Sequence, residues 1–209
     1  AHPNALSIQA LWAVPRTGAV VAPLNPRLGA ASMERALDVI GPDLILSTEQ
    51  DVRDPALKAA LDADWLTTLD DLPRLAGEEG GGAVVDAAYM TGATPEPEPS
   101  PVALLWTSGT SGDHSASAVP ILSSALEASA NASVARLGLT ERDRWYASLS
   151  LGHVGGLALV HRAAHVGCTL LVRGRFSAEV LGELIGREGL THASLVPTML
   201  RRLLDVRGG

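Results

Sequence analysis

The sequence predicts an α/β protein in which helices cover a parallel sheet. Short apolar segments alternate with longer helical ones along most of the 209 residues, and this order favours strands joined by helical crossovers. Hydrophobic residues make up 46% of the chain but aromatic residues only 3%, so the core must consist mainly of alanine, valine and leucine. Such a core suits helices packed closely on a buried sheet, and the length allows one large or two small domains.

The first half of the chain gives helix and strand signals in turn. Asn4 can cap a helix that runs to about Arg16. The Asn25-Pro26 turn precedes a second helix that ends near Gly41, and a short helix is expected around residues 54–62. Strands are expected over residues 18–24, 43–47 and 65–67.

Residues 77–101 differ from the rest of the chain because glycine, glutamate and proline dominate them. This composition indicates an exposed, linker-like excursion. The α/β order then resumes, with a strand over 102–106 and a loop over 107–119. Further strands are expected at 145–149, 169–172 and 192–196, and helices at 120–137, 155–166, 177–188 and from Pro197 onward.

Charge and cysteine content exclude several classes of protein. Residues 1–100 hold 15 acidic and 6 basic side chains, and residues 101–209 hold 8 and 10, so no basic nucleic-acid face is indicated. The single cysteine, Cys168, excludes an internal disulfide and is compatible with a cytoplasmic location. No apolar run reaches the ~18 residues of a membrane span, and the first residues do not have the pattern of a signal peptide.

The stretch ALLWTSGTSGDHSASAV (103–119) carries the main candidate site. A loop of glycine and hydroxyl residues follows a buried strand, and its backbone N–H groups and hydroxyls can surround a phosphate. The loop is neither a P-loop nor a dinucleotide fingerprint, and a simple serine–glycine turn explains its composition equally well. It contains no lysine, because Lys58 is the only lysine among the 16 basic residues.

A second candidate is a metal site on the helix predicted at 155–166. His161 and His165 are four residues apart, with Cys168 just beyond, and this spacing can hold zinc. No glutamate completes an H-E-x-x-H motif, and no C-x-x-C is present. Two helix-face histidines and a small buried thiol are the better interpretation, so no metal site is predicted.

Three stretches in order resemble the adenylate-forming superfamily, the acyl-CoA synthetases and their relatives. LLWTSGTSG resembles the family's phosphate-binding signature, Thr-Ser-Gly-Thr-Thr-Gly-x-Pro-Lys-Gly. Residues 18–46 resemble the segment that precedes this signature. Residues 149–160 and 175–205 resemble the segment that follows it, most of all in o-succinylbenzoate–CoA and fatty-acid–CoA ligases.

The resemblance implies a role for individual residues. The family's phosphate-binding positions fall on Thr107, Ser108, Gly109, Thr110, Ser111 and Gly112. Its lysine falls on Ser115, so the cradle is kept but its cation is lost, which weakens the expected phosphate binding. His153, Gly155 and Gly156 match the stretch at the family's acyl pocket, and Gly152 stands where the family usually has an aromatic residue. The pocket wall is then either wider there or filled by another group.

The resemblance also implies a reaction in which ATP activates a carboxylate to an acyl-adenylate, and CoA then takes the acyl group. The expected cofactors are ATP or AMP, Mg²⁺ and CoA, and the expected partner is a small carboxylic acid. The family's later motifs for adenine, magnesium and ribose, and its C-terminal lysine, find no match here. The fold is therefore expected to be the N-terminal domain of such an enzyme, incomplete at both ends, with subdomains at 1–138 and 139–209.

The parent enzyme is thus an AMP-forming acid–CoA ligase, while the 209-residue chain alone is expected to be inactive and to self-associate through its cut edges. The main alternative is a degenerate, non-catalytic module of the same fold that binds phosphate or another protein. A structural protein and a metal-binding protein remain as further alternatives.

Overall fold

The computed structural model describes residues 3–25, 27–47, 66–68, 101–107, 117–187 and 189–208. The helix predicted at 54–62, nearly all of the predicted excursion and most of the candidate phosphate loop lie outside these residues. The excursion's last residue, Pro101, begins a strand.

The first half of the chain begins with a capped helix. Helix α1 (Ala5–Ala13) starts where the Asn4 side chain accepts a hydrogen bond of 2.7 Å from the backbone N–H of Ser7, and a 3₁₀ turn, η1 (Val14–Thr17), follows it. Helix α2 (Ala30–Ile40) runs between two glycines, and Gly41 ends it in the left-handed conformation with φ 56°. Strand β1 (Ile45–Ser47) pairs in parallel with β2 (Leu66–Thr68).

The strand predicted at 18–24 is reduced to a single bridge. Val21 pairs in parallel with Ala103, and its two backbone hydrogen bonds reach Val102 at 3.1 Å and Leu104 at 2.8 Å. No further pairing of this segment with strand β3 (Pro101–Trp106) occurs among the described residues. The apolar run therefore lies against the sheet but does not extend it.

The prediction of a loop to residue 119 followed by a helix at 120–137 is wrong at its start. Residues 118–122 form strand β4 (Ala118–Leu122), which pairs antiparallel with β3, and helix α6 (Ser123–Leu137) begins after it. Pro120 is tolerated in the first turn of a helix, so the sequence alone did not exclude one. Pairing with β3 decides the conformation, and the chain thus contains an antiparallel hairpin beside its parallel strands.

The second half forms a three-stranded parallel sheet in the order β6-β5-β7. Its strands are β5 (Arg144–Ala147), β6 (Thr169–Val172) and β7 (His192–Ala193). The helices between and after them are α7 (Val154–Val166), α8 (Ala178–Arg187) and α9 (Pro197–Gly208). These elements confirm the predicted order, although β5 and β7 end earlier than expected.

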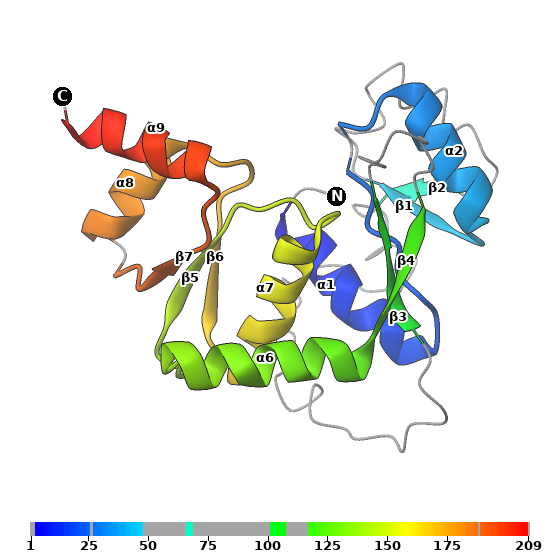
Figure 1. Ribbon diagram of the computed structural model, residues 1–209, viewed down its shortest axis with the longest axis horizontal. Helices are drawn as coiled ribbons and strands as arrows, with labels where there is room; N and C mark the ends of the chain where they lie inside the picture. The colour runs from blue at the N-terminus through cyan, green and yellow to red at the C-terminus, as the bar shows by residue number, and fades with distance from the viewer. Residues whose placement is uncertain are drawn as a thin grey trace, which may run out of the picture.

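Side chains on β5 alternate between two helical layers, as the period of a strand requires. Trp145 and Ala147 pack with Leu139 and Leu159 on the side of α6 and α7. Tyr146 packs with residues of α8 and α9 on the other side, and Figure 1 shows the two layers on opposite sides of the sheet. The mixed helix-and-sheet fold with a parallel sheet is confirmed.

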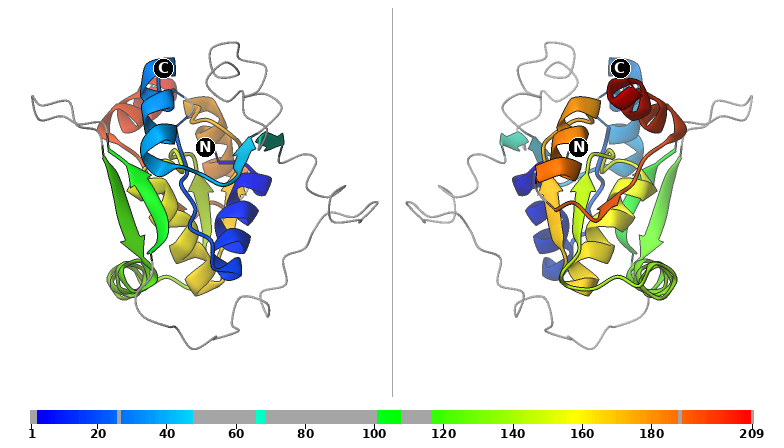
Figure 2. Two further views of the ribbon diagram at one scale, coloured as in Figure 1. Left: turned by 90° about the vertical axis from the view of Figure 1, so that its right-hand side faces the viewer. Right: turned by 90° about the vertical axis from the view of Figure 1, so that its left-hand side faces the viewer.

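Helix α6 connects the antiparallel hairpin to this sheet. It runs along the lower side of the molecule in Figure 1, and Figure 2 shows it end-on below β3 and β4. The predicted boundary between subdomains falls at Gly138, which ends α6 in the left-handed conformation; the division itself stays a prediction. Among the described residues, no helix has the length and apolar character needed to cross a membrane.

Candidate functional site

The candidate phosphate loop is closed at its base by Thr107 and Ser117. The backbone N–H of Thr107 donates to the Ser117 carbonyl at 3.0 Å, and the backbone N–H of Ser117 donates to the Thr107 hydroxyl at 3.2 Å. The two hydroxyls also lie 3.3 Å apart. Ser108 to Gly112 lie outside the described residues, so the structure places the two ends of the loop, at the ends of β3 and β4.

The second part of the candidate site is the amino end of α7. His153 is exposed and takes the N-cap position, with φ −123° and ψ 149°, but its side chain makes no capping hydrogen bond. Its carbonyl accepts hydrogen bonds from Gly156 at 3.0 Å and Leu157 at 3.1 Å. The first turn of the helix carries no acidic residue, so the positive end of the helix dipole is not neutralised by an acid in that turn.

Two glycines allow the chain to turn sharply into this helix. A Cβ at Gly156 would lie 2.2 Å from the carbonyl oxygen of Ser150, so any side chain there would collide with the turn before the helix. A Cβ at Gly155 would meet only a methyl group of Leu149, at 3.3 Å. Gly155 is exposed and Gly156 is buried. The first turn of α7 therefore lies directly on the 149–150 backbone.

The loop base and the amino end of α7 lie on the same side of the molecule. Leu157 packs with Ala103 and Leu105 of β3, which ties the start of α7 to this strand. In Figure 1 the end of β3, the start of β4 and the start of α7 all face upward. The carboxyl end of β5 faces the same way, as expected for sites at the carboxyl ends of parallel strands.

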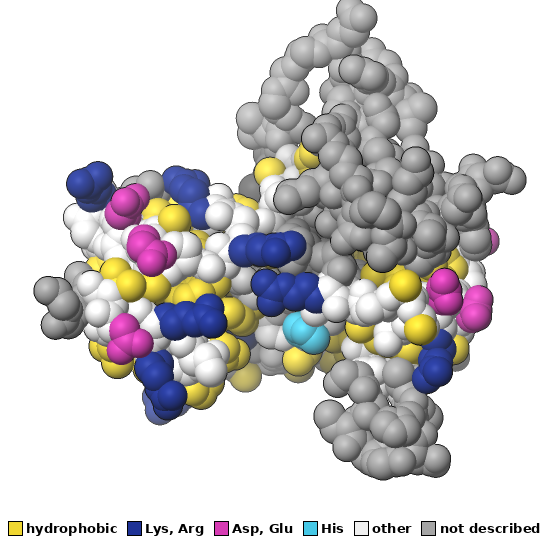
Figure 3. Space-filling view, turned by 90° about the horizontal axis from the view of Figure 1, so that it is seen from above, with side chains coloured by type: hydrophobic (Ala, Val, Ile, Leu, Met, Phe, Trp, Pro, Cys, Tyr) yellow, Lys and Arg dark blue, Asp and Glu magenta, His cyan; other side chains and the backbone are white. Residues whose placement is uncertain are grey.

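Figure 3 shows this upper face of the molecule. Basic side chains and one histidine lie in its middle, whereas basic and acidic side chains are mixed toward its two ends. The exposed Arg173 and Arg175 follow the carboxyl end of β6, next to β5 in the sheet. Nothing in the sequence distinguishes these arginines, because they belong to no motif and only the sheet order places them beside the site. A cluster of basic side chains in the middle of the face suits an anionic ligand.

The histidines that raised the metal hypothesis make other contacts. His161 stacks on Trp12 of α1, with ring centroids 5.3 Å apart and an angle of 23° between the rings. His165 Nε2 lies 2.9 Å from the side-chain oxygen of Asn131, and burial raises the pKa of the Cys168 thiol. No group of three or more metal-binding side chains occurs within the described part of the chain.

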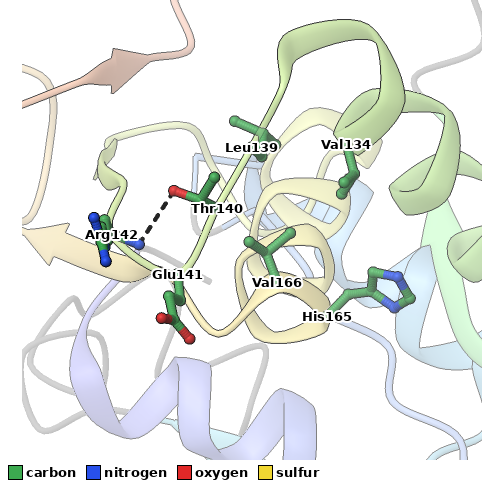
Figure 4. A pocket seen from close by; sticks show the side chains of 7 residues that line it. All are labelled: Val134, Leu139, Thr140, Glu141, Arg142, His165 and Val166. Carbon is green, nitrogen blue, oxygen red and sulfur yellow. Dashed lines mark hydrogen bonds between the residues drawn. The ribbon is translucent and has the colours of Figure 1, made fainter.

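A surface hollow of about 530 Å³ lies at the other end of α7 (Figure 4). Its lining comes from the carboxyl ends of α6 and α7 and the turn after α6, namely Val134, Leu139, Thr140, Glu141, Arg142, His165 and Val166. His165 is twelve residues from His153, which corresponds to roughly 18 Å along a helix. The hollow is therefore separate from the candidate site.

The fold and this arrangement define the class of protein. A mixed fold of helices and a parallel sheet, shared with solved acid–CoA ligases over almost the whole chain, matches the N-terminal domain of adenylate-forming enzymes. The chain belongs to the AMP-binding enzyme family, whose family model matches residues 3–209.

Curated relatives of this chain are acid–CoA ligases. The chain is 36% identical over 81 residues to the 2-succinylbenzoate–CoA ligase of Listeria monocytogenes. The aligned region covers 39% of this chain and 17% of that protein. It is 33% identical over 144 residues to the corresponding ligase of Bacillus velezensis, covering 64% of this chain and 26% of that protein.

Solved structures share the fold over almost the whole chain. The o-succinylbenzoate coenzyme A synthetase from Bacillus subtilis in complex with AMP matches with a TM-score of 0.77 at 24% identity, covering 98% of this chain and 50% of that one. A malonyl-CoA ligase with methylmalonyl-CoA and AMP bound matches with a TM-score of 0.78 at 26% identity, covering 99% and 40%. The chain thus spans at most about half the length of these proteins.

Proposed function

We propose that this chain supplies the phosphate loop and the acyl-pocket helix of an acid–CoA ligase, which activates a small carboxylic acid with ATP and transfers the acyl group to CoA. The observation that carries the proposal is the placement of the Thr107–Ser117 loop base and the amino end of α7 on one side of the molecule. The basic side chains in the middle of that face support it, because every substrate of this reaction is an anion.

The chemistry asked of these residues is electrostatic. In the proposed site, N–H and hydroxyl groups of Thr107, Ser108, Gly109, Thr110, Ser111 and Gly112 hold the phosphates that leave as pyrophosphate when the carboxylate attacks the α-phosphate. His153 lies beside the carboxylate end of the acid, with Gly155 and Gly156 forming the wall of its pocket. Mg²⁺ would neutralise phosphate charge, and none of the described residues is proposed as its ligand.

A second candidate function follows from Ser115. The phosphate loop of the family carries a lysine at this position, and the chain has serine there. A fold of this kind that binds a nucleotide or phosphate without performing the reaction would tolerate the loss of the cation. For both candidate functions the proposed location is the cytoplasm, in keeping with a single, unpaired cysteine.

Titration of the labelled 209-residue chain with pyrophosphate and with ATP tests the proposed site. Amide resonances of residues 107–117 are expected to shift, with weak affinity because the lysine is missing. Ser115→Lys adds a charge-assisted contact worth about 1.5–3 kcal/mol, so affinity is expected to rise about tenfold or more. If these amides stay still while others move, the loop does not bind phosphate and the proposal fails.

Thr107→Val tests whether the loop itself contributes to phosphate binding. It keeps the side-chain shape but removes the hydroxyl that pairs with Ser117, and about 1 kcal/mol of phosphate binding is expected to be lost. Ser133→Ala is the control, because the Ser133 hydroxyl donates within α6, to the Ser129 carbonyl. Equal loss of affinity in both variants would mean that the loop is not the site.

Release of pyrophosphate separates the two candidate functions. It is to be measured with ATP and a panel of aryl and fatty acids on the longer protein that contains this segment. Turnover in that protein supports the ligase, whereas nucleotide binding without turnover supports the binding module.

A further inference from the structure

Gly152 lies where two distant parts of the backbone touch. It sits in the turn between β5 and α7 and is buried. A Cβ at this position would lie 2.9 Å from the backbone nitrogen of Asn25 and 2.9 Å from the carbonyl oxygen of Pro23. Separations below 3.0 Å essentially never occur for a real Cβ, so any other residue requires one of the two segments to move.

The segment at residues 23–25 is anchored and does not yield easily. Two residues earlier, Val21 is hydrogen-bonded on both sides to β3. Pro23 is buried and has a fixed φ. Asn25 is held in a turn, since its side chain accepts a hydrogen bond from the Arg27 backbone at 3.1 Å and its carbonyl accepts one from Leu28 at 3.0 Å.

On the other side, Gly152 is joined firmly to the amino end of α7. Its backbone N–H donates to the Ser150 hydroxyl at 3.3 Å, and the next N–H, that of His153, donates to the Ser150 carbonyl at 3.2 Å. Gly156 lies so close to the same carbonyl that a Cβ would overlap it. A displacement at position 152 is therefore passed on to His153 and to the first turn of α7.

We propose that Gly152 is a positioning residue. Its missing side chain lets the turn rest directly on the backbone of Pro23–Asn25, and this contact sets the distance of His153 and the amino end of α7 from β3 and the loop base at Thr107. The proposal rests on the proposed function, since that distance matters for a reaction between an acid at His153 and phosphates in the loop. The adenylate-forming superfamily usually has an aromatic residue at this position. In this chain the backbone of Pro23–Asn25 fills the space beside Gly152 instead.

The size of the effect follows from the contact distances. Ordinary contact of a Cβ with a neighbouring atom lies between 3.4 and 4 Å, so alanine at position 152 requires a separation larger by about 0.5–1 Å. A misplacement of about 1 Å between reacting groups can cost ~10²-fold in rate. A single methyl group at this joint is therefore expected to disturb the site without touching a ligand.

A distance measurement across the joint tests the proposal on the chain itself. A spin label is attached at Val119→Cys, an exposed site on β4, with Cys168→Ala to remove the native thiol. Broadening of the His153 and Val154 amide resonances then reports their distance from the hairpin. Gly152→Ala is expected to change this broadening. Gly182→Ala in α8 is the control, because a Cβ there meets no atom within 4 Å, and broadening should stay as in the unsubstituted protein.

Wild-type broadening in folded Gly152→Ala would overturn the proposal. If that variant does not fold, Pro23→Ala is made alone, because freeing the fixed φ loosens the segment on which the turn rests; wild-type broadening of the His153 and Val154 resonances in folded Pro23→Ala then also overturns the proposal. A change in Gly182→Ala as large as that in Gly152→Ala would do the same. Pyrophosphate titration of the unsubstituted chain decides the proposed function separately, so failure of one is distinguishable from failure of the other.

Discussion

His161 shows how burial changes the chemistry of a single residue. The ring projects from α7 and is stacked on Trp12 of α1, and its Nδ1 atom is buried without a hydrogen-bond partner among the described residues. Burial lowers the pKa of His161 below its ordinary value of 6.5, and the neighbouring His165 lowers it further, while Glu127 acts in the opposite direction. The folded state therefore favours the neutral form of the His161 ring over the protonated form.

Stability is expected to fall as pH drops through the titration of His161. The unfolded chain binds a proton near pH 6.5 and the folded chain only at lower pH, so the folded state loses stability from about pH 6.5 downward and keeps it above. His161→Phe preserves the stack on Trp12 and should flatten this dependence. Urea unfolding of both proteins at several pH values between about 7.5 and 5.5 measures it.

Asp143 does not interfere with this measurement. Its pKa is lowered from 3.8, first by the hydrogen bond from the Thr140 backbone, so it titrates below the range of interest. An equally steep loss of stability in His161→Phe would show that the buried imidazole is not the titrating group.

At the scale of elements, helices α7 and α8 use glycine for different reasons. Gly156 in the first turn of α7 is needed because a Cβ would overlap the Ser150 carbonyl. Gly186 in α8 has no atom within 4 Å of the added carbon, and its backbone is helical. The same substitution at the two sites therefore has opposite expected signs.

Gly156→Ala is expected to destabilise the protein by 2 kcal/mol or more, as an overpacked site whose neighbour is rigid backbone, on the order of the ~1–3 kcal/mol typical of overpacking. Gly186→Ala is expected to stabilise it by about 0.4–1 kcal/mol, since alanine reduces the entropy of the unfolded chain. Thermal or denaturant unfolding compares them. Destabilisation of similar size in both variants would show that the close contact of Gly156 with the Ser150 carbonyl has no effect beyond ordinary helix propensity.

At the scale of the whole molecule, the outer side of α9 is apolar and exposed. Val196, Leu200 and Leu204 are spaced four residues apart, so they form one stripe, and they are 43%, 47% and 60% exposed. Leu203, three residues after Leu200 and beside this stripe, is buried in the core with Tyr146 and Leu181. The helix thus presents apolar side chains both to the core and to solvent.

Self-association of the 209-residue chain through this stripe is expected, because exposed apolar surface favours contact between copies. Light scattering over a range of concentrations should show a rising mass, and Leu200→Lys with Leu204→Lys should suppress it. Val39→Lys on α2, at a site 57% exposed, is the control and should leave the association unchanged. A monomer at every concentration would contradict the prediction.

The sequence by itself determined the order of helices and strands after residue 138, the cap at Asn4 and the end of α2 at Gly41. These features depend on residues within a few positions of one another, where side-chain hydrogen bonds and backbone preferences act directly. The glycine- and hydroxyl-rich loop and the ordered stretches around it also pointed to the AMP-binding family, because a motif is a local pattern.

Only the tertiary structure decided how distant segments meet. It made β4 a strand rather than the start of a helix, reduced the 18–24 segment to one bridge at Val21, and brought His161 against Trp12. It also placed Gly152 on the backbone of Asn25. Each of these outcomes depends on a partner far away in the chain. Local propensity differs by at most about 1 kcal/mol per residue apart from proline, so long-range pairing and packing override it.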